Sequence, residues 1–398
     1  MQRGQGLRIP MVDLIGYVIL FVISIEMGLV NTDLQLSGTI SLCFLILVLF
    51  LFMLFLFCFN YELSIFIVIL FFILIAFLTY LDTNSKDFIY MLVLAIVVQK
   101  LSYEKTFKTI FLIRVVMLIF IIGLSLFGVL NIYQTLVNKQ NLYSVTGYGL
   151  GFTHPNRLAY TVLYILSIFI AMKNKKLTAS NSVFLLVLSI LTYFITQSRT
   201  IIFITVVFFF LLTFYYLKIT QKYFVRLVKL FSAISIPLCV FISIGIPTIL
   251  IRGGGKIKTC AVWIDTLFSG RFTHIRRAFL NCPITLFGGQ NDFSTLENLY
   301  GYSTIDNSYI RLLYGFGIVG FSLFIIFSTI AIYRLIKRDE YIYLLLIIVT
   351  AFLGVAENIL TTSAVSIISI FWSELLRGVK SKEVIKLENR VSVHNPTY

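Results

Sequence analysis

The sequence predicts an all-α protein that crosses a membrane many times. Hydrophobic residues make up 59% of the chain and charged residues only 12%. Apolar runs of about 20 residues recur along nearly the whole length, and a helix of that length spans a hydrocarbon core of about 30 Å. A chain of 398 residues has room for about 12 such spans and little else. We therefore expect a single transmembrane domain over residues 1–398.

Each expected span is an apolar run between charged or polar residues. The longest run, from Leu36 to Leu81, must hold two helices because one helix of that length would far exceed the bilayer. We place the turn at Asn60-Tyr61-Glu62. The expected spans are 11–30, 36–59, 61–81, 88–99, 110–133, 156–172, 182–197, 200–217, 230–251, 309–333, 341–357 and 359–375.

The positions of the cations predict the orientation. A net charge of +15 would favour nucleic-acid binding in a soluble protein, but here Lys and Arg cluster in alternate loops. The positive-inside rule assigns such loops to the cytoplasm. We therefore expect no nucleic-acid partner, contact with membrane lipid, both termini in the cytoplasm, and a basic cytoplasmic tail over 376–398. The first span has no small-residue cleavage site and reads as an uncleaved anchor.

This topology puts four polar segments on the outer side. The longest loop, 252–308, contains SGRFTHIRR at 269–277, which holds three arginines and one of the three histidines of the chain. The other segments are GLGFTHPNRLA at 149–159, TQSRT at 196–200 and IDNSYIRLLYGFGIVG at 305–320. Arginines on the outer side run against the orientation rule, which favours a functional use.

Each residue also has a structural interpretation. An arginine near the end of a span often extends to the lipid headgroups. His154 would simply orient its loop, and glycines in a span usually allow close helix packing. Cys260 and Cys282 share the outer loop, and the sequence leaves open whether they form a disulfide. The joint placement of these residues on one side, beside an aspartate, favours a site.

Several motifs in order carry a resemblance. They are HPN (His154-Pro155-Asn156), SRT (Ser198-Arg199-Thr200), SGR (Ser269-Gly270-Arg271), LFGG (286–289), and DNSY (306–309) leading into GFGIVG. Over about residues 90–375 the chain resembles the O-antigen polymerase and ligase superfamily, the Wzy-type polymerases of oligosaccharide repeat units. Arg277 and Gly288 also fit an arginine-ten-residues-glycine pattern of polymerase outer loops. The resemblance implies a GT-C-like fold with one large external loop between the ninth and tenth spans.

The resemblance implies transfer of a glycan from a polyprenyl-diphosphate donor to a hydroxyl of another lipid-linked repeat unit. This reaction would build a capsular, exopolysaccharide or O-antigen chain on the outer face of the bacterial cytoplasmic membrane. A chain-length regulator and a flippase are implied partners. Related ligases commonly carry His-Asn where this chain has Asp306-Asn307, so we expect a polymerase.

The reaction needs a counter-charge for the diphosphate and a base for the hydroxyl. Arginine suits the first role because its planar fork binds phosphate oxygens bidentately. We expect Asp306 or His274 as the catalytic base; the alternative for Asp306 is a cap of the tenth span. We expect no metal and no cofactor. The expected substrate-binding residues are Arg199, Arg271, Arg276, Arg277, His154, Asn156 and Asn307.

Other classes remain open. A ligase that attaches finished glycan to a different acceptor is closest in sequence. A flippase or other transporter would also have about 12 spans, but internal repeats and ionisable or broken helices near the midplane would be expected. The centres of the predicted spans carry almost no charge apart from Glu26 and Arg114, which would lie near span ends or face inward. A purely structural membrane scaffold is the remaining alternative.

Overall fold

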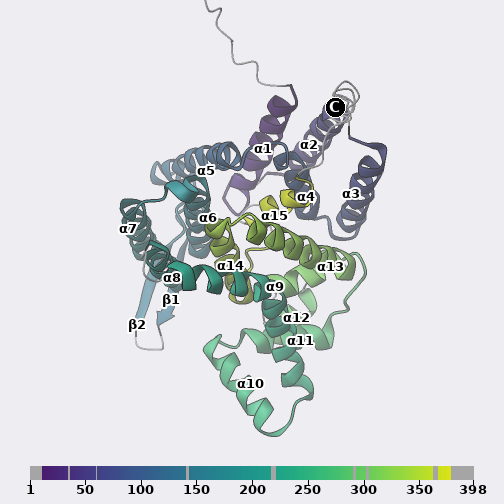
Figure 1. Ribbon diagram of the computed structural model, residues 1–398. Helices are drawn as coiled ribbons and strands as arrows, with labels where there is room; N and C mark the ends of the chain where they lie inside the picture. The colour runs from purple at the N-terminus through teal and green to yellow at the C-terminus, as the bar shows by residue number, and fades with distance from the viewer. Residues whose placement is uncertain are drawn as a thin grey trace, which may run out of the picture.

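The computed structural model describes the backbone of residues 11–34, 36–59, 61–139, 143–216, 221–289, 293–301, 304–361 and 366–377. Most of the basic tail expected at 376–398 lies outside the described residues. Figure 1 shows helices throughout, with one β-hairpin beside them in the described part of the chain. In chain order the elements are α1 (Met11–Leu29), α2 (Gly38–Phe59), α3 (Leu63–Thr83), α4 (Asp87–Val98), α5 (Tyr103–Leu126), β1 (Gln134–Lys139), β2 (Tyr143–Tyr148), α6 (Pro155–Lys173), η1 (Asn174–Lys176), α7 (Ala179–Thr196), α8 (Arg199–Tyr216), α9 (Gln221–Arg252), α10 (Gly255–Leu267), α11 (Arg271–Asn281), α12 (Ser294–Tyr300), α13 (Ser308–Lys337), α14 (Tyr341–Ala356), α15 (Ile368–Phe371) and η2 (Trp372–Leu375).

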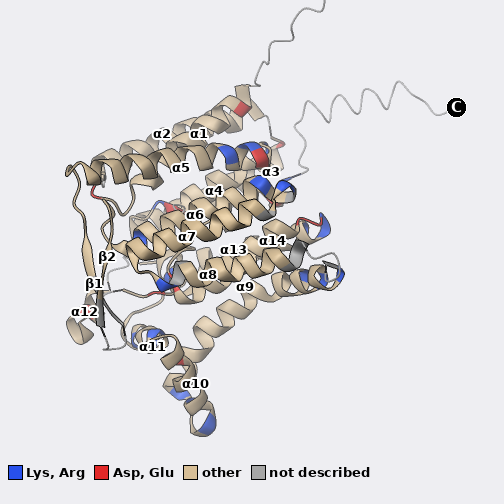
Figure 2. Ribbon diagram, turned by 90° about the vertical axis from the view of Figure 1, so that its left-hand side faces the viewer, with Lys and Arg blue, Asp and Glu red and all other residues tan. Residues whose placement is uncertain are grey.

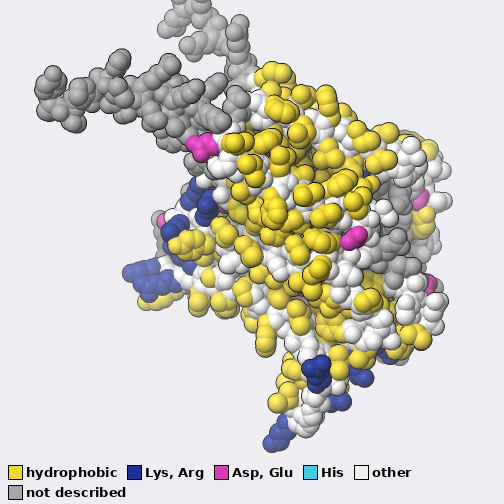
Figure 3. All heavy atoms as spheres, turned by 90° about the vertical axis from the view of Figure 1, so that its right-hand side faces the viewer, with side chains coloured by type: hydrophobic (Ala, Val, Ile, Leu, Met, Phe, Trp, Pro, Cys, Tyr) yellow, Lys and Arg dark blue, Asp and Glu magenta, His cyan; other side chains and the backbone are white. Residues whose placement is uncertain are grey.

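The helical content confirms the predicted fold class, and the apolar helices indicate a membrane protein. Within the described residues, seven helices are long and apolar enough to cross a membrane. They are α1, α2, α3, α5, α6, α9 and α13. Shorter apolar stretches lie in α4, α7, α8 and α14. Figure 3 shows a broad, mostly hydrophobic surface with Lys and Arg at its left-hand edge and at the bottom, as expected of a face that contacts lipid.

The first three spans lie where the sequence placed them. α1, α2 and α3 begin and end within about two residues of the predicted 11–30, 36–59 and 61–81. α4 lies within one residue of the predicted 88–99, but it differs from the first three helices in length and burial: it has only 12 residues, and 11 of them are buried. At 1.5 Å per residue it measures about 18 Å, less than the hydrocarbon core of about 30 Å. It is a central core helix of the bundle.

Two predicted spans begin too late. α5 begins at Tyr103 instead of residue 110, because Ser102 caps it by accepting a hydrogen bond from the Lys105 backbone N at 3.4 Å. α9 begins at Gln221 instead of residue 230. In both cases the helix continues into polar residues that the apolar pattern leaves out. α5 also ends at Leu126 and not at 133, and the following residues lead into the β1–β2 hairpin, which the sequence did not predict.

The stretch 359–375 is not one helix, contrary to the prediction. α14 ends at Ala356, and the described residues beyond it form bends, the four-residue α15 and the four-residue η2. The hydroxyl of Ser308 explains the interruption, because its Oγ accepts from the backbone N of Ile359 at 2.8 Å and of Leu360 at 3.0 Å. These amides are bonded to a side chain instead of to a preceding turn of helix.

Connections between the helices gather at the two ends of the bundle (Figure 2). The loop end carries the hairpin and α10–α12. It is tied together by a β-bridge between Thr32 and Phe152 and by the Asn131 backbone N, which donates to Asp33 Oδ2 at 2.7 Å. The opposite end carries many of the blue Lys and Arg segments of Figure 2. Ion pairs join its connections, among them Lys229–Asp339 at 2.8 Å.

α13 is broken at Gly317, whose φ of +67° and ψ of −178° are not helical. The loop residues before α12 fill the break: the backbone N of Ile318 donates to Thr285 O and that of Val319 to Leu286 O, each at 3.0 Å. A Cβ on Gly317 would lie 2.2 Å from the backbone N of Gly288. The LFGG and GFG motifs therefore pack backbone against backbone; for the glycines of the span, close packing was the structural interpretation.

The two charges that the sequence analysis singled out near span centres, Glu26 and Arg114, both face inward. Glu26 is 2% exposed and pairs with Lys86, while its Oε2 accepts from the Tyr90 hydroxyl at 2.5 Å. Arg114 is 4% exposed, and its guanidinium carbon lies 5.3 Å from the centre of the Tyr164 ring. Charges buried in a membrane protein are normally held by such partners.

Candidate functional site

The SGR motif makes the turn that aims Arg271 into the bundle. Ser269 and Gly270 have φ of +56° and +80°, a left-handed conformation that favours glycine. Asp265 then accepts from the backbone N of Phe272 at 2.8 Å and from the Thr273 hydroxyl at 2.5 Å, so it caps α11. Arg271 is the first residue of α11, and its position is fixed by this turn.

The DNS part of the DNSY motif joins the start of α13 to the end of α14. Asn307 caps α13, because its Oδ1 accepts from the Ile310 backbone N at 3.0 Å. Its Nδ2 donates to Val355 O at 2.7 Å and to Ser243 Oγ at 2.9 Å. Asn307 is 0% exposed, so its burial does not support the substrate contact predicted for it. It is a scaffold residue, and the cap that the sequence considered for Asp306 belongs to it.

Asp306 lies beside Arg271 and is open to solvent. Its side chain is 51% exposed, and its Oδ2 lies 3.9 Å from Arg271 Nη2. The two residues that the sequence assigned to the base and to the donor site are therefore neighbours. Because Asn307 supplies the cap, Asp306 has no capping role that would explain its presence.

Glu357 is the functional candidate that the sequence missed. It is the C-terminal capping residue of α14 and is 4% exposed. Its Oε1 accepts from Arg271 Nη2 at 3.1 Å, and its Oε2 accepts from the Tyr160 hydroxyl of α6. In the sequence it is a single acid at the end of an apolar run, and nothing in that pattern shows that it faces Arg271.

Arg199, Arg271 and Glu357 line one cavity of about 780 Å³. Apart from Ser269, the remaining lining is apolar and comes from α8, α10, α14 and the turn after α10. These residues are Phe203, Ile204, Val207, Leu211, Leu267, Phe268, Ile348, Val349, Phe352, Leu353 and Ala356. Two cations and one carboxylate thus stand at the polar end of a hydrocarbon-lined space, at the loop end of the bundle. The SRT and SGR motifs meet here, although 72 residues separate Arg199 from Arg271.

His154 caps α6 and lies within electrostatic range of Asp306. Its Nδ1 accepts from the Asn156 backbone N at 3.1 Å, which is the structural role considered for it. Asn156 follows it, half-buried, in the first turn of α6. Burial lowers the pKa of His154, as does Arg157, while Asp306 opposes the shift. Both residues predicted in the HPN motif are therefore near the site, and Nδ1 of His154 is already used to cap α6.

Arg157 and Arg311 are two further cations that the sequence did not single out. Arg157 lies one turn from Tyr160 on α6, and Arg311 lies in the first turn of α13 over the Phe293 ring, 5.9 Å from its centre. Arg311 is within electrostatic range of both Arg157 and Asp306. Among the described residues, neither guanidinium has a carboxylate within 4.0 Å. The helix starts place these cations around Asp306.

α11 divides its other predicted residues between two surroundings. His274 is half-buried near Asp306; burial lowers its pKa, as do Arg277 and Arg271, against the opposing charges of Asp265 and Asp306. A lowered pKa leaves the imidazole neutral and able to accept a proton. Arg277 lies over the Tyr300 ring of α12, 4.4 Å from its centre.

Arg276 is half-buried on α11 and does not line the large cavity. The structure thus brings Arg199 and Arg271 together and leaves Arg276 and Arg277 outside the cavity lining. The assisting role expected for these two receives no support from their placement.

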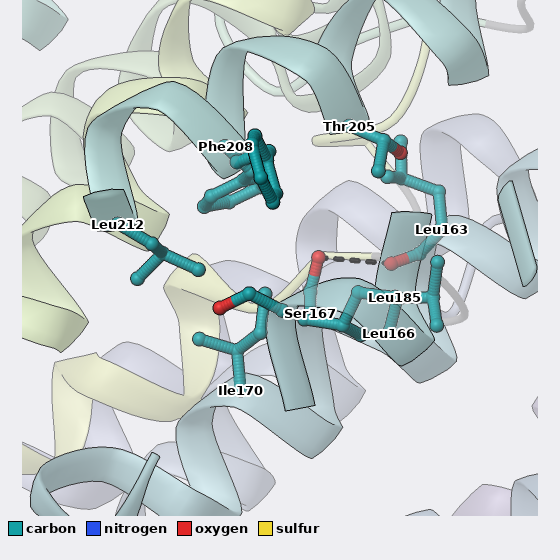
Figure 4. Close-up of a pocket in the computed structure, with 10 residues that line it drawn as sticks. Leu163, Leu166, Ser167, Ile170, Leu185, Thr205, Phe208 and Leu212 are labelled. Carbon is teal, nitrogen blue, oxygen red and sulfur yellow. Dashed lines mark hydrogen bonds between the residues drawn. The ribbon is translucent and has the colours of Figure 1, made fainter. Parts of the chain in front are cut away.

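A second cavity lies deeper, between α6, α7 and α8 (Figure 4). It measures about 10 Å³ and is lined mainly by Leu, Ile and Phe side chains. The Ser167 hydroxyl in it donates to Leu163 O at 2.9 Å. It is a packing defect that no sugar or lipid headgroup would fit.

Cys260 and Cys282, whose pairing the sequence left open, are both free.

Comparisons with known proteins add no identification, because no protein-family model, no curated protein and no solved structure matches this chain.

Proposed function

We propose that this protein is a membrane glycosyltransferase that joins polyprenyl-diphosphate-linked oligosaccharide repeat units into a polysaccharide. One observation carries the proposal. Four helices, α6, α8, α11 and α13, begin around the same site, and each has an arginine in its first turn: Arg157, Arg199, Arg271 and Arg311. None of the four has an acid in that turn.

This arrangement runs against helix electrostatics. The N-terminus of a helix carries a partial positive charge, so each cation there is unfavourable by about 0.3–1 kcal/mol. Glu357 and Asp306 offset only part of the charge, since they pair with Arg271 alone within 4.0 Å among the described residues. An anionic substrate would relieve the excess, and a diphosphate has enough oxygens to engage several guanidinium groups.

The cavity supports a lipid-linked form of that anion. Arg199 and Arg271 stand at its polar end, and apolar side chains of α8 and α14 line the rest. A polyprenyl tail would lie along these side chains while its diphosphate reaches the arginines. Its volume of about 780 Å³ suits the part of such a lipid next to the headgroup.

Asp306 is the base that this geometry favours. It is exposed at the site and 3.9 Å from Arg271, whereas Glu357 is buried. Asp306 would take the proton of the acceptor hydroxyl as its oxygen bonds to the anomeric carbon of the donor. The bond from that carbon to the diphosphate oxygen breaks, and the lipid diphosphate leaves with its charge held by Arg199 and Arg271. His274 is the competing base.

The proposed orientation puts the loop end outside a bacterial cytoplasmic membrane. The opposite end carries many cations, as cytoplasmic loops do. Twelve spans, as expected from the sequence, are an even number, which would put the two ends of the chain on the same side of the membrane. Both termini would then be cytoplasmic. A flippase and a chain-length regulator would act on the same substrate.

The broken helix α13 favours one alternative, a transporter, because such helices often supply binding groups. In this protein the loop 285–289 already bonds to the backbone around Gly317. The break therefore offers a substrate no free backbone group at those positions. The large cavity, moreover, lies at the loop end.

The test is polymerisation by purified protein in lipid nanodiscs. Lipid-linked repeat units, extracted from cells from which the gene has been deleted, should become a ladder of longer lipid-linked chains. Arg199→Ala and Arg271→Ala should abolish the ladder. A protein that leaves the repeat units unchanged but transfers a finished glycan to another lipid is a ligase. Movement of repeat units across a vesicle membrane without new bonds would establish a transporter and contradict the proposal.

A further inference from the structure

Glu357 is a buried carboxylate that the proposed reaction does not use. Glu357 is 4% exposed. Its Oε1 accepts a hydrogen bond from Arg271, and its Oε2 accepts one from the Tyr160 hydroxyl. Each oxygen is therefore held by one donor, and the side chain is buried, so an acceptor hydroxyl would reach it less readily than it reaches the exposed Asp306. These contacts place Glu357 to hold a neighbour.

The backbone around Glu357 is fixed as firmly as its side chain. The Ser308 hydroxyl donates to Glu357 O at 2.6 Å and accepts from the next two available amides, those of Ile359 and Leu360. Asn307 bonds to Val355 O, two residues earlier. The start of α13 therefore sets the position of Glu357, and Tyr160 of α6 sets the direction of its carboxylate.

Arg271 gains most from this anchor. It stands on α11, an 11-residue helix of the loop region, and its long side chain has many rotamers. Glu357 engages Nη2 alone; no hydrogen bond joins Nε or Nη1 to any described residue. A guanidinium has five N–H donors in a rigid fork. One edge of the fork is thus held, and the other is left for an anion in the cavity.

We infer that Glu357, oriented by Tyr160, is a positioning residue that holds Arg271 with one edge of its guanidinium turned toward the diphosphate. This inference rests on the proposed function, because it takes a lipid diphosphate as the ligand of that edge. Glu357 acts through Arg271 and takes no part in proton transfer.

Binding selectivity separates positioning from simple charge. Farnesyl diphosphate and farnesyl monophosphate are suitable probes, because they share one tail and differ in the anion. A fixed fork favours the diphosphate, which it can bind at more than one oxygen. Glu357→Gln keeps the size of the side chain but removes a negative charge. Loss of positioning lowers the preference for diphosphate, whereas the charge change alone raises it.

We expect Glu357→Gln and Tyr160→Phe each to reduce the ratio of monophosphate to diphosphate dissociation constants by about 3-fold or more, measured with protein in nanodiscs. Arg271→Gln should reduce it at least as much, and adding Glu357→Gln to that variant should change nothing further. Phe352→Leu, on the apolar wall of the cavity, is the control and should alter both affinities equally.

A higher ratio in Glu357→Gln, or an equal further loss when it is combined with Arg271→Gln, would overturn the inference. So would an unchanged ratio in both single variants. The proposed function fails separately: in that case the unaltered protein would show no preference for diphosphate. If Glu357→Gln does not accumulate, Tyr160→Phe gives the same test, because it leaves the carboxylate and removes only one of its donors.

Discussion

Nη2 of Arg271 lies 3.9 Å from Oδ2 of Asp306 and 3.1 Å from Oε1 of Glu357. One guanidinium thus links the start of α11, the start of α13 and the end of α14. Because Arg271 lines the cavity, a substitution at any of these three helix ends should alter the geometry of the cavity.

Replacement of Arg199 or Arg271 should abolish activity while the protein remains in the membrane. Arg199→Ala and Arg271→Ala should each lower kcat/KM for the lipid-linked donor by about 10²-fold or more, as loss of a placed anion donor does. Arg271→Lys should recover little, because a point charge cannot replace the fork. Lys258→Ala, an exposed cation on α10, is the matched control. Near-normal polymer from both alanine variants would refute the diphosphate site.

Asp306→Asn should fold normally and lose activity. Stability should not change, because Asn307 and not Asp306 caps α13. Loss of a base would lower the rate by about 10²–10⁴-fold, measured as polymer formed per time at saturating donor. Farnesyl diphosphate binding should persist. Full activity of this variant would transfer the role of base to His274.

Asn307→Ala should destabilise the protein. The change removes the cap of Ile310 N and leaves Val355 O and Ser243 Oγ without this buried partner. We expect a loss of about 2–3 kcal/mol in unfolding free energy, seen as a lower melting temperature in detergent. Asp306→Asn, one residue earlier, is the control. A melting temperature equal to that of the unaltered protein would show that Asn307 is not structural.

Gly317→Ala should prevent the loop 285–289 from packing against the break in α13. The added Cβ would lie 2.2 Å from Gly288 N and 2.3 Å from Leu286 O, and these backbone atoms cannot yield without moving the loop. We expect the free energy of unfolding to fall by about 2 kcal/mol or more. The readout is a reduced yield of monodisperse protein. Gly289→Ala is the control because no atom lies within 4 Å of its Cβ position. Equal yields of the two variants would contradict the packing described here.

His274 should make stability depend on pH. Its folded-state pKa is lowered, chiefly by burial, so below an unfolded value of about 6.5 the unfolded chain binds a proton more readily. Its contribution is therefore present above about pH 6.5 and is lost as the pH falls through the folded pKa. His274→Gln should reduce the drop in melting temperature between pH 7.5 and pH 5. His154→Gln should also reduce this drop, since the pKa of His154 is lowered too. If the drop in melting temperature is unchanged in both variants, these histidines are not its cause.

The sequence by itself determined the helical membrane class and the positions of most helices. Apolar runs must be buried in lipid or protein, and a helix satisfies its own backbone there, so the run from Leu36 to Leu81 had to become two helices. It also singled out Arg199, Arg271 and Asp306 as candidates, because charge is rare in this chain and stands out where it occurs. Helix starts such as Tyr103 were missed because capping residues extend a helix beyond its apolar run.

Only the tertiary structure decided which of these residues meet. Glu357 has no signal in sequence, because its importance comes from Arg271 and Tyr160, which reach it from other helices. The sequence also left open whether Asp306 caps α13, since Asp and Asn are both good capping residues; the hydrogen bond from Ile310 N to Asn307 Oδ1 assigns the cap to Asn307. The interruption of 359–375 has the same origin: its composition is apolar, but Ser308 takes its amides. Periodicity specifies what a segment buries, whereas hydrogen bonds between distant segments specify where its polar groups lie.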